Sequence, residues 1–173
     1  LAVSYDSLGE FVAGLRQAAG QPNAAFETIG VRQQGEYRQL NTNTLQSESE
    51  LYAPIRLKRV TKPGERISDA LEARGVEYVE IRSLDVNPYA AAGIDLDQIL
   101  FLDLFLTYCL LKDSPRLSRQ QQHSSRQNLN KVAIGGRDVS LQLTDDGQPK
   151  SLKAWAEEIF AELIQLARLL DHG

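Results

Sequence analysis

The sequence predicts an α+β fold in which helices pack on one face of an antiparallel or mixed β-sheet. Two segments, residues 50–58 and 77–82, alternate apolar and polar residues with the period of two that is typical of strands. Four other segments carry helix caps or apolar stripes at helical spacing, namely 5–19, 96–112, 118–132 and 151–171. At 173 residues the chain has the length of a single domain, or of one part of a larger one.

The first helix is expected over residues 5–19, where Ser7 and Glu10 have the spacing of a capping box. Residues 26–45 are expected to form short strands around a turn at Gln34-Gly35. The polar run at 41–44 is typical of a loop. Its amide side chains either bind their own backbone in Asx turns or face a substrate.

The two alternating segments each have an apolar face and a polar face. The apolar positions are Leu51, Ala53, Ile55 and Leu57 in the first segment and Val79 and Ile81 in the second. The polar positions are Glu50, Tyr52, Pro54, Arg56 and Lys58, followed by Tyr78, Glu80 and Arg82. One interpretation of the polar face is a solvated surface, where cross-strand ion pairs contribute only about 0.2–1 kcal/mol each. The other is a site in which carboxylates hold a divalent metal and basic groups contact phosphate.

Proline cannot donate to a strand ladder, so Pro54 indicates an edge strand with an accessible rim. A short helix is expected over residues 67–74, because Gly75 stands where a C-terminal cap is usual. The strand at 77–82 is expected to stop by Asn87-Pro88.

A helix is expected to start at Asp95 or Asp97 and to run to about Lys112, and its residues are apolar on almost every side, which indicates a buried helix. It is shorter than the roughly 20 residues of a membrane span and contains a central Asp103, so a membrane protein is not expected. Cys109, within it, is expected to lie in the core. His123, among glutamines and serines, is expected at the surface.

The last third of the chain alternates helix and turn signals. Ser118 and Gln121 mark a helix start, and Gly135-Gly136 marks its end. A short extended piece over 139–143 and a turn at 145–147 precede the final helix, which begins at Ser151. The apolar stripe of that helix predicts a docking surface.

Composition excludes several classes of protein. A net charge of −4 argues against nucleic-acid binding, which usually requires a basic patch. The single cysteine rules out an internal disulfide and is compatible with a reducing cytoplasm. No signal peptide is visible, and the absence of any methionine predicts a chain cut from a longer protein.

Two long blocks carry a family resemblance. They are Leu40-Asn41-Thr42-Asn43 with Glu50-Leu51-Tyr52-Ala53-Pro54-Ile55-Arg56-Leu57-Lys58-Arg59, and Glu77-Tyr78-Val79-Glu80-Ile81-Arg82-Ser83-Leu84-Asp85-Val86-Asn87-Pro88-Tyr89. The blocks resemble bacterial glutamate–cysteine ligases (γ-glutamylcysteine synthetases), and the likeness covers most of residues 5–135. It departs at Leu129, where the family pattern has tryptophan.

This resemblance implies part of a glutamine-synthetase-like catalytic fold within a longer, cytoplasmic ligase. The implied reaction uses ATP and Mg²⁺ (or Mn²⁺) to join the γ-carboxylate of L-glutamate to the amine of L-cysteine through a γ-glutamyl phosphate, which begins glutathione biosynthesis. It also implies that Glu80 is a metal ligand, that Arg82 is the catalytic group facing the transferred phosphoryl, and that Tyr52 lines the cysteine pocket. Arg56 and Lys58 are further expected contacts for anionic substrate or nucleotide.

Other interpretations remain open at this point. Glu48 or Glu50 is a weaker candidate for a second metal carboxylate. The chain could belong to another carboxylate–amine ligase of related fold, or to a regulatory or interaction module that keeps the fold without the chemistry. The isolated piece is expected to be inactive, since a reaction centre needs all its parts in place, and to self-associate through exposed sheet edges.

Overall fold

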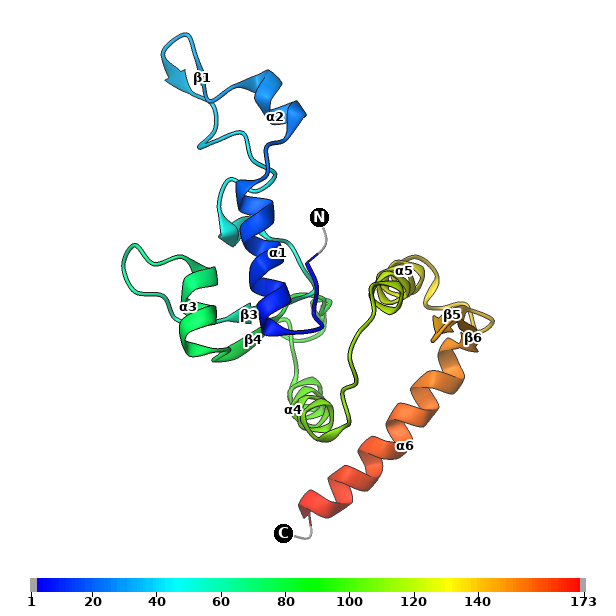
Figure 1. Ribbon diagram of the computed structural model, residues 1–173. Helices are drawn as coiled ribbons and strands as arrows, with labels where there is room; N and C mark the ends of the chain where they lie inside the picture. The colour runs from blue at the N-terminus through cyan, green and yellow to red at the C-terminus, as the bar shows by residue number, and fades with distance from the viewer. Residues whose placement is uncertain (1–2, 172–173) are drawn as a thin grey trace. The chain divides into compact units, whose positions relative to one another are not determined.

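The computed structural model describes residues 3–171, which fall into two compact units, one ending at Leu84 and the other beginning at Asp85. Helices and antiparallel β-hairpins occur in both, which confirms the α+β class (Figure 1). Over these residues the strands form three separate two-stranded sheets instead of one continuous sheet. Because compact units can belong to one domain, the single domain inferred from the length stays a prediction.

The first unit opens with helix α1 (Leu8–Gly20), and the Ser7 hydroxyl accepts from the Glu10 backbone N–H as expected. Helix α2 (Ala24–Ile29) follows, where strand had been expected. The Asn23 side chain caps α2 by accepting from the Ala25 N–H, a signal strong enough to start a helix.

The predicted turn at Gln34-Gly35 is confirmed. It joins strand β1 (Arg32–Gln33) to β2 (Glu36–Tyr37). Both turn residues have positive φ, at 54° and 87°, as a tight hairpin turn requires.

The second half of the first unit contains the paired strands. A 3₁₀ helix, η1 (Glu48–Glu50), precedes β3 (Ile55–Lys58), and helix α3 (Ile67–Arg74) leads to β4 (Tyr78–Ile81). Strand β3 is shorter than expected because η1 and Pro54 occupy its first part. Helix α3 ends at Gly75 with φ 73°, as predicted.

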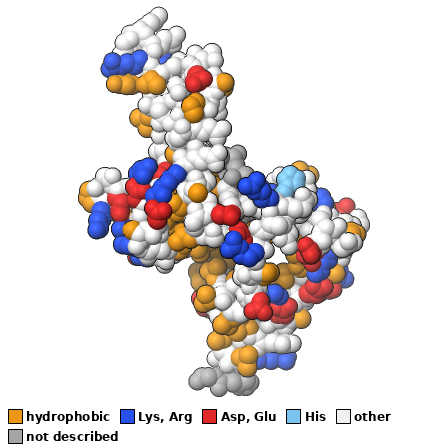
Figure 2. All heavy atoms as spheres, viewed as in Figure 1, with side chains coloured by type: hydrophobic (Ala, Val, Ile, Leu, Met, Phe, Trp, Pro, Cys, Tyr) orange, Lys and Arg blue, Asp and Glu red, His pale blue; other side chains and the backbone are white. Residues whose placement is uncertain are grey.

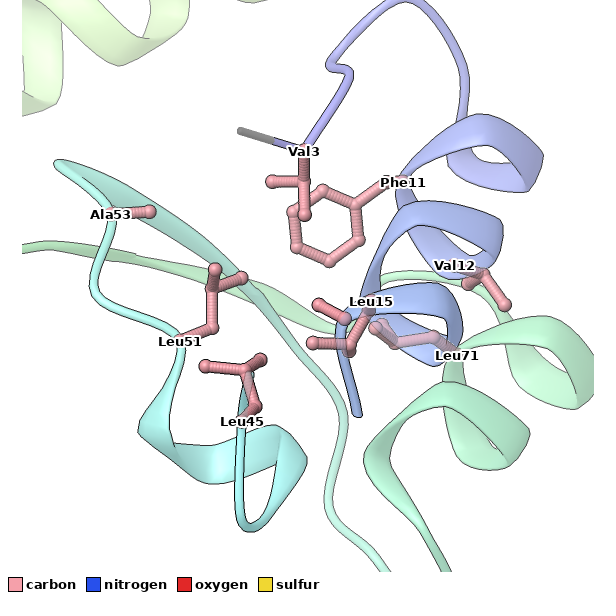
Figure 3. Packing of buried hydrophobic residues seen from close by; sticks show 9 residues of the cluster. Val3, Phe11, Val12, Leu15, Leu45, Leu51, Ala53 and Leu71 are labelled. Atoms are coloured by element: carbon pink, nitrogen blue, oxygen red, sulfur yellow. The ribbon is translucent and has the colours of Figure 1, made fainter. Parts of the chain in front are cut away.

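The core of the first unit lies between α1, α3 and the segment that leads into β3. Phe11, Leu15 and Leu71 are at most 2% exposed, and Figure 3 shows their side chains pointing toward one another. Leu51 and Ala53 face the same cluster, so the apolar face predicted for this segment is buried at its first two positions. The remaining members of the cluster are Val3, Val12, Ala18 and Leu45.

The second unit has three helices and one hairpin. The helices are α4 (Leu96–Leu111), α5 (Arg119–Gly135) and α6 (Leu152–Asp171), and the strands are β5 (Gln142–Asp145) and β6 (Gln148–Ser151). Capping boxes at Asp95 and Ser118 start α4 and α5. Ser118 was predicted, and Asp95 is the one of the two expected candidates, Asp95 and Asp97, that caps α4. The Asp146-Gly147 turn is confirmed and joins β5 to a strand β6 that had not been expected.

Helix α4 is not the buried helix that was expected. None of its residues is buried, and Cys109 is exposed. One side contacts α6 through Phe101 and Phe160, whose ring centroids lie 5.8 Å apart, and through the 2.7 Å ion pair of Lys112 with Glu162. Leu100, Leu110 and Leu111 are more than half exposed, and Figure 2 shows hydrophobic side chains at the surface of this region.

The stripe predicted for α6 is also largely uncovered, since Leu163 is its one buried residue among those described. His123 is exposed, as predicted. Over residues 3–171, no helix combines the length and apolarity needed to cross a bilayer.

Candidate functional site

The antiparallel pairing of β3 and β4, which α3 separates in the sequence, brings the predicted site residues of these strands onto one face. Arg56 pairs with Glu80 and Lys58 with Tyr78 in the antiparallel register. Directly opposed residues project to the same side of a sheet, and residues two apart share a face. The polar face inferred from alternation is therefore confirmed as a geometric feature.

Arg82 lies at the end of this face beside Tyr52. Its backbone N–H donates to the Pro54 carbonyl at 2.7 Å, which extends the ladder between β3 and β4 by one hydrogen bond without requiring a donor from the proline. Its guanidinium carbon stands 5.6 Å from the centre of the Tyr52 ring, within the range of a cation–π contact. Tyr52 itself is 78% exposed, so its ring is accessible as predicted.

Glu80 is surrounded by cations. One carboxylate oxygen, Oε2, is 3.4 Å from Lys58 Nζ and 4.0 Å from Arg56 Nη1, and the other, Oε1, is 3.7 Å from Arg82 Nε. Oε2 is shielded from solvent and accepts no hydrogen bond from the described part of the chain. The face thus combines an unsatisfied carboxylate oxygen with an excess of positive charge.

Arg56 differs from its expected position at an accessible rim. It is only 9% exposed, and its Nη2 donates to the Ser49 carbonyl in η1 at 2.9 Å. A guanidinium at this depth neutralises part of the Glu80 charge and anchors the chain ahead of Tyr52. Lys58 is half-buried and closer to the surface.

Both weaker metal candidates already bind the protein. The Glu48 carboxylate is buried and accepts from the Ser68 N–H at 2.8 Å and from the Ser68 hydroxyl at 2.6 Å. Glu50 accepts from the Gln46 N–H at 2.7 Å. Within residues 3–171 no three acidic, histidine or cysteine side chains cluster as a complete metal site would require, so Glu80 is a single candidate carboxylate.

The polar run 41–44 follows the turn interpretation. The Asn43 N–H donates to Asn41 Oδ1 at 2.8 Å, which closes an Asx turn. Asn43 Nδ2 donates to the Ala19 carbonyl at the end of α1. These amides therefore hold the loop against α1 rather than face a substrate.

Strong ion pairs lie elsewhere in the first unit, on α3. Hydrogen bonds from Arg66 and Arg16 hold the pKa of Asp69 at about 2, and those from Arg74 do the same for Glu65. Figure 2 shows acidic and basic side chains adjoining over this helix. Sequence reasoning did not single out these pairs, although the i, i+3 spacing of Arg66 and Asp69 could have indicated one of them.

One exposed aromatic on the polar face was not assigned a role from the sequence. Tyr78 on β4 lies opposite Lys58 on β3 and is 49% exposed. Its position in the alternation placed it on this face, but alternation alone does not distinguish a pocket residue from a surface one.

Comparison with known proteins identifies relatives of the whole chain. The family model described as glutamate-cysteine ligase matches residues 1–132. The chain is 51% identical to a glutamate–cysteine ligase of Shewanella amazonensis over 171 residues, which is 99% of this chain and 32% of that protein. It is 49% identical to one of Vibrio vulnificus, covering 100% of this chain and 34% of the relative.

A solved structure is similar as well. The glutamate–cysteine ligase of Francisella tularensis in complex with AMP superposes with a TM-score of 0.92 at 42% identity. The match covers 97% of this chain and 34% of that one. The chain therefore spans about a third of the length of these relatives.

Proposed function

The chain belongs to the glutamate–cysteine ligase family, and we propose that it forms part of an ATP-dependent ligase that joins L-glutamate to L-cysteine. The product is γ-glutamylcysteine, formed through a γ-glutamyl phosphate in the first step of glutathione biosynthesis. The observation that carries the proposal is the face of β3 and β4. There Glu80 lies among Lys58, Arg56 and Arg82 beside an accessible Tyr52.

Ligation of this kind needs groups that position charge. A carboxylate does not react with an amine until it is activated, and transfer of the γ-phosphoryl of ATP to the carboxylate provides the activation. The transfer depends on placing the reactants in line and on cations that stabilise the charge on the moving phosphoryl oxygens. Arg82, with a side chain 36% exposed, is the guanidinium on this face with most access to such a group.

The remaining residues take complementary roles. Tyr52 forms one wall of the pocket for cysteine, and Arg82 against its ring keeps that pocket beside the phosphoryl site. Lys58 contributes positive charge for the nucleotide or the substrate carboxylates. Arg56 adds charge from below, where its burial keeps it from direct contact with a ligand in this conformation.

The shielded Oε2 of Glu80 fits one oxygen ligand of Mg²⁺ or Mn²⁺. When bound, the metal neutralises phosphate oxygens. Because cations surround Glu80, we infer that the metal is bound together with an anionic phosphate chain, whose charge offsets theirs. The AMP complex of the Francisella relative supports nucleotide use by this family.

Two further properties belong to this proposal. The ligase acts in the cytoplasm, where a free Cys109 is stable. The isolated chain self-associates through unpaired strand edges and an apolar surface. Over the described residues, β3 and β4 have no further strand paired to them, and none of the apolar residues of α4 is buried.

The test uses the complete ligase that carries this chain. We expect ADP release that requires both glutamate and cysteine. Glu80→Gln and Arg82→Gln should each lower kcat by about 10²-fold or more, as loss of one transition-state contact typically does. Glu36→Gln, which changes an exposed carboxylate on β2, should leave kcat unchanged.

Tyr52→Phe should raise the KM for cysteine more than the KM for glutamate, and that result separates this ligase from one with another amine substrate. Wild-type activity in Glu80→Gln and Arg82→Gln, or ADP release that ignores cysteine, would overturn the proposal. The 173-residue chain alone should show no ligation, and measurable glutamate- and cysteine-dependent ADP release from it would contradict that expectation.

A further inference from the structure

Arg56 contacts both Glu80 on β4 and the 3₁₀ helix η1 that precedes Tyr52. Its Nη1 stands 4.0 Å from Glu80 Oε2 on β4, and its Nη2 donates to the Ser49 carbonyl in η1 at 2.9 Å. The two contacts come from different nitrogens of one planar group. The side chain is only 11% exposed, so its geometry is set by the protein.

The second contact bears on Tyr52. Ser49 lies three residues before Tyr52, and the Leu51 N–H closes the 3₁₀ turn onto the Glu48 carbonyl. Leu51 and Ala53 point into the core on either side of Tyr52, which leaves the Tyr52 ring projecting outward. The direction of that ring therefore depends on where η1 is held.

Lys58 offers a natural comparison. It approaches the same Glu80 oxygen, at 3.4 Å, yet no hydrogen bond joins it to η1 among the described contacts. Both side chains supply positive charge to Glu80, and Arg56 adds the connection to the segment that carries Tyr52.

We propose that Arg56 is a positioning residue that fixes the Tyr52 wall of the cysteine pocket relative to the metal and phosphate ligand Glu80. This rests on the proposed function and deepens it, because it adds a buried guanidinium, behind the more exposed Arg82, that aligns the amine pocket with the phosphoryl site. Arginine suits the task because its five donors form a rigid fork that serves two partners, whereas lysine has a single nitrogen on a flexible stem.

The experiment measures kcat and the KM values for cysteine and ATP in the complete ligase. Arg56→Lys keeps the charge and loses the fork. We expect it to raise the KM for cysteine and lower kcat, by about 10-fold to 100-fold in combined kcat/KM, the usual effect of losing a group that orients a ligand residue. Lys58→Gln should affect the KM for ATP and leave the KM for cysteine within about twofold.

The matched control is Arg59→Lys. Arg59 also anchors backbone carbonyls, those of Arg74 and Gly75 at the end of α3, and its ion pair is with Glu77 instead of Glu80. It should lower the melting temperature about as much as Arg56→Lys without changing the KM for cysteine. A general loss of stability would move both variants alike.

A second variant covers poor folding of Arg56→Lys. Ser49→Gly leaves Arg56 in place and loosens the turn that its guanidinium holds. It should raise the KM for cysteine, by less than Arg56→Lys does, with the KM for ATP unchanged.

Two results would overturn the inference. One is a KM for cysteine that is the same in Arg56→Lys, or in Ser49→Gly if the first does not fold, as in Arg59→Lys. The other is a KM for cysteine that rises equally in Lys58→Gln. Either result, obtained with an active wild-type ligase, would leave the proposed function standing. An inactive wild-type ligase would refute the proposed function instead.

Discussion

Replacing Glu48 tests whether this carboxylate is a structural cap or a metal ligand. Helix α3 begins after Arg66, whose side chain makes no cap hydrogen bond. The Glu48 carboxylate takes that place from twenty residues earlier, by accepting from the N–H and the hydroxyl of Ser68. Ser68 is 0% exposed, so its N–H and hydroxyl depend on the Glu48 carboxylate instead of on water.

The cost of the change follows from those two bonds. Glu48→Ala leaves two buried donors without an acceptor, at about 1–3 kcal/mol each, so the free energy of unfolding of the first unit should fall by about 3 kcal/mol. Glu48→Gln keeps one oxygen acceptor, and the Ser68 hydroxyl can rotate to accept from the new amide. The free energy of unfolding then falls by only about 1 kcal/mol, because a neutral amide oxygen forms a weaker hydrogen bond than a charged carboxylate oxygen. Glu50→Ala, at an exposed position, should cost about 0.5 kcal/mol or less.

Hydrogen exchange followed by mass spectrometry is the suitable assay. The only tryptophan, Trp155, lies in the second unit, so its fluorescence does not report on α3. A loss of about 3 kcal/mol should accelerate exchange of the α1 and α3 amides about 100-fold. Unchanged exchange in Glu48→Ala, together with a higher Mg²⁺ requirement of the complete ligase, would refute the cap and favour a metal ligand.

Three further predictions concern packing, pH and the thiol. Leu71→Ala should lower the free energy of unfolding by about 2–5 kcal/mol because Leu71 is 0% exposed. Leu110→Ala, at a position 84% exposed, should change it by about 0.5 kcal/mol or less. Chemical denaturation followed by circular dichroism measures both. Hydrogen bonds from Arg74 lower the pKa of Glu65 from 4.5 to about 2, so the stability that this pair contributes is present above pH 4.5 and is lost as the pH falls through 2. Titration of the Glu65 carboxyl by NMR checks this, and Arg74→Gln should return the pKa toward 4.5. Cys109 is exposed, but partial burial raises the pKa of its thiol above the ordinary value of 9.0. A thiol reagent should therefore label the native chain, and the labelling rate should still increase above pH 9. A thiol that reacts only in denaturant would contradict this.

Local signals in the sequence were sufficient wherever a few neighbouring residues decide the structure. Ser7 and Ser118 start their helices as predicted, and Asp95 is one of the two predicted candidates for α4, because a cap needs only its own backbone within three residues. The turn at Gln34-Gly35 is local for the same reason. The segment around Phe26, which was expected to be a strand, forms helix α2 because the Asn23 side chain caps its first turn.

Long-range partners account for what could not be predicted. Glu48 binds Ser68, twenty residues away, and nothing near Glu48 in the sequence indicates that distance. The apolar character of α4 predicted a buried helix, but within residues 3–171 only α6 packs against it substantially and none of its residues is buried. Burial of Cys109 requires a neighbour on that side, and apolar composition does not specify which segment provides it.

The polar face of β3 and β4 likewise combines a feature that the sequence predicts with one that it does not. Alternation established that Arg56, Lys58, Glu80 and Arg82 project to one side, since period two fixes the face of a strand. It could not establish depth, because depth depends on what lies above each position, and here η1 folds back so that the Ser49 carbonyl meets the Arg56 guanidinium. Arg56 and Lys58 approach one oxygen of the same carboxylate, yet one is buried and the other half-buried. In our proposal, the buried Arg56 aligns the site and the more exposed Lys58 meets the ligand. The position of η1 accounts for this difference in depth.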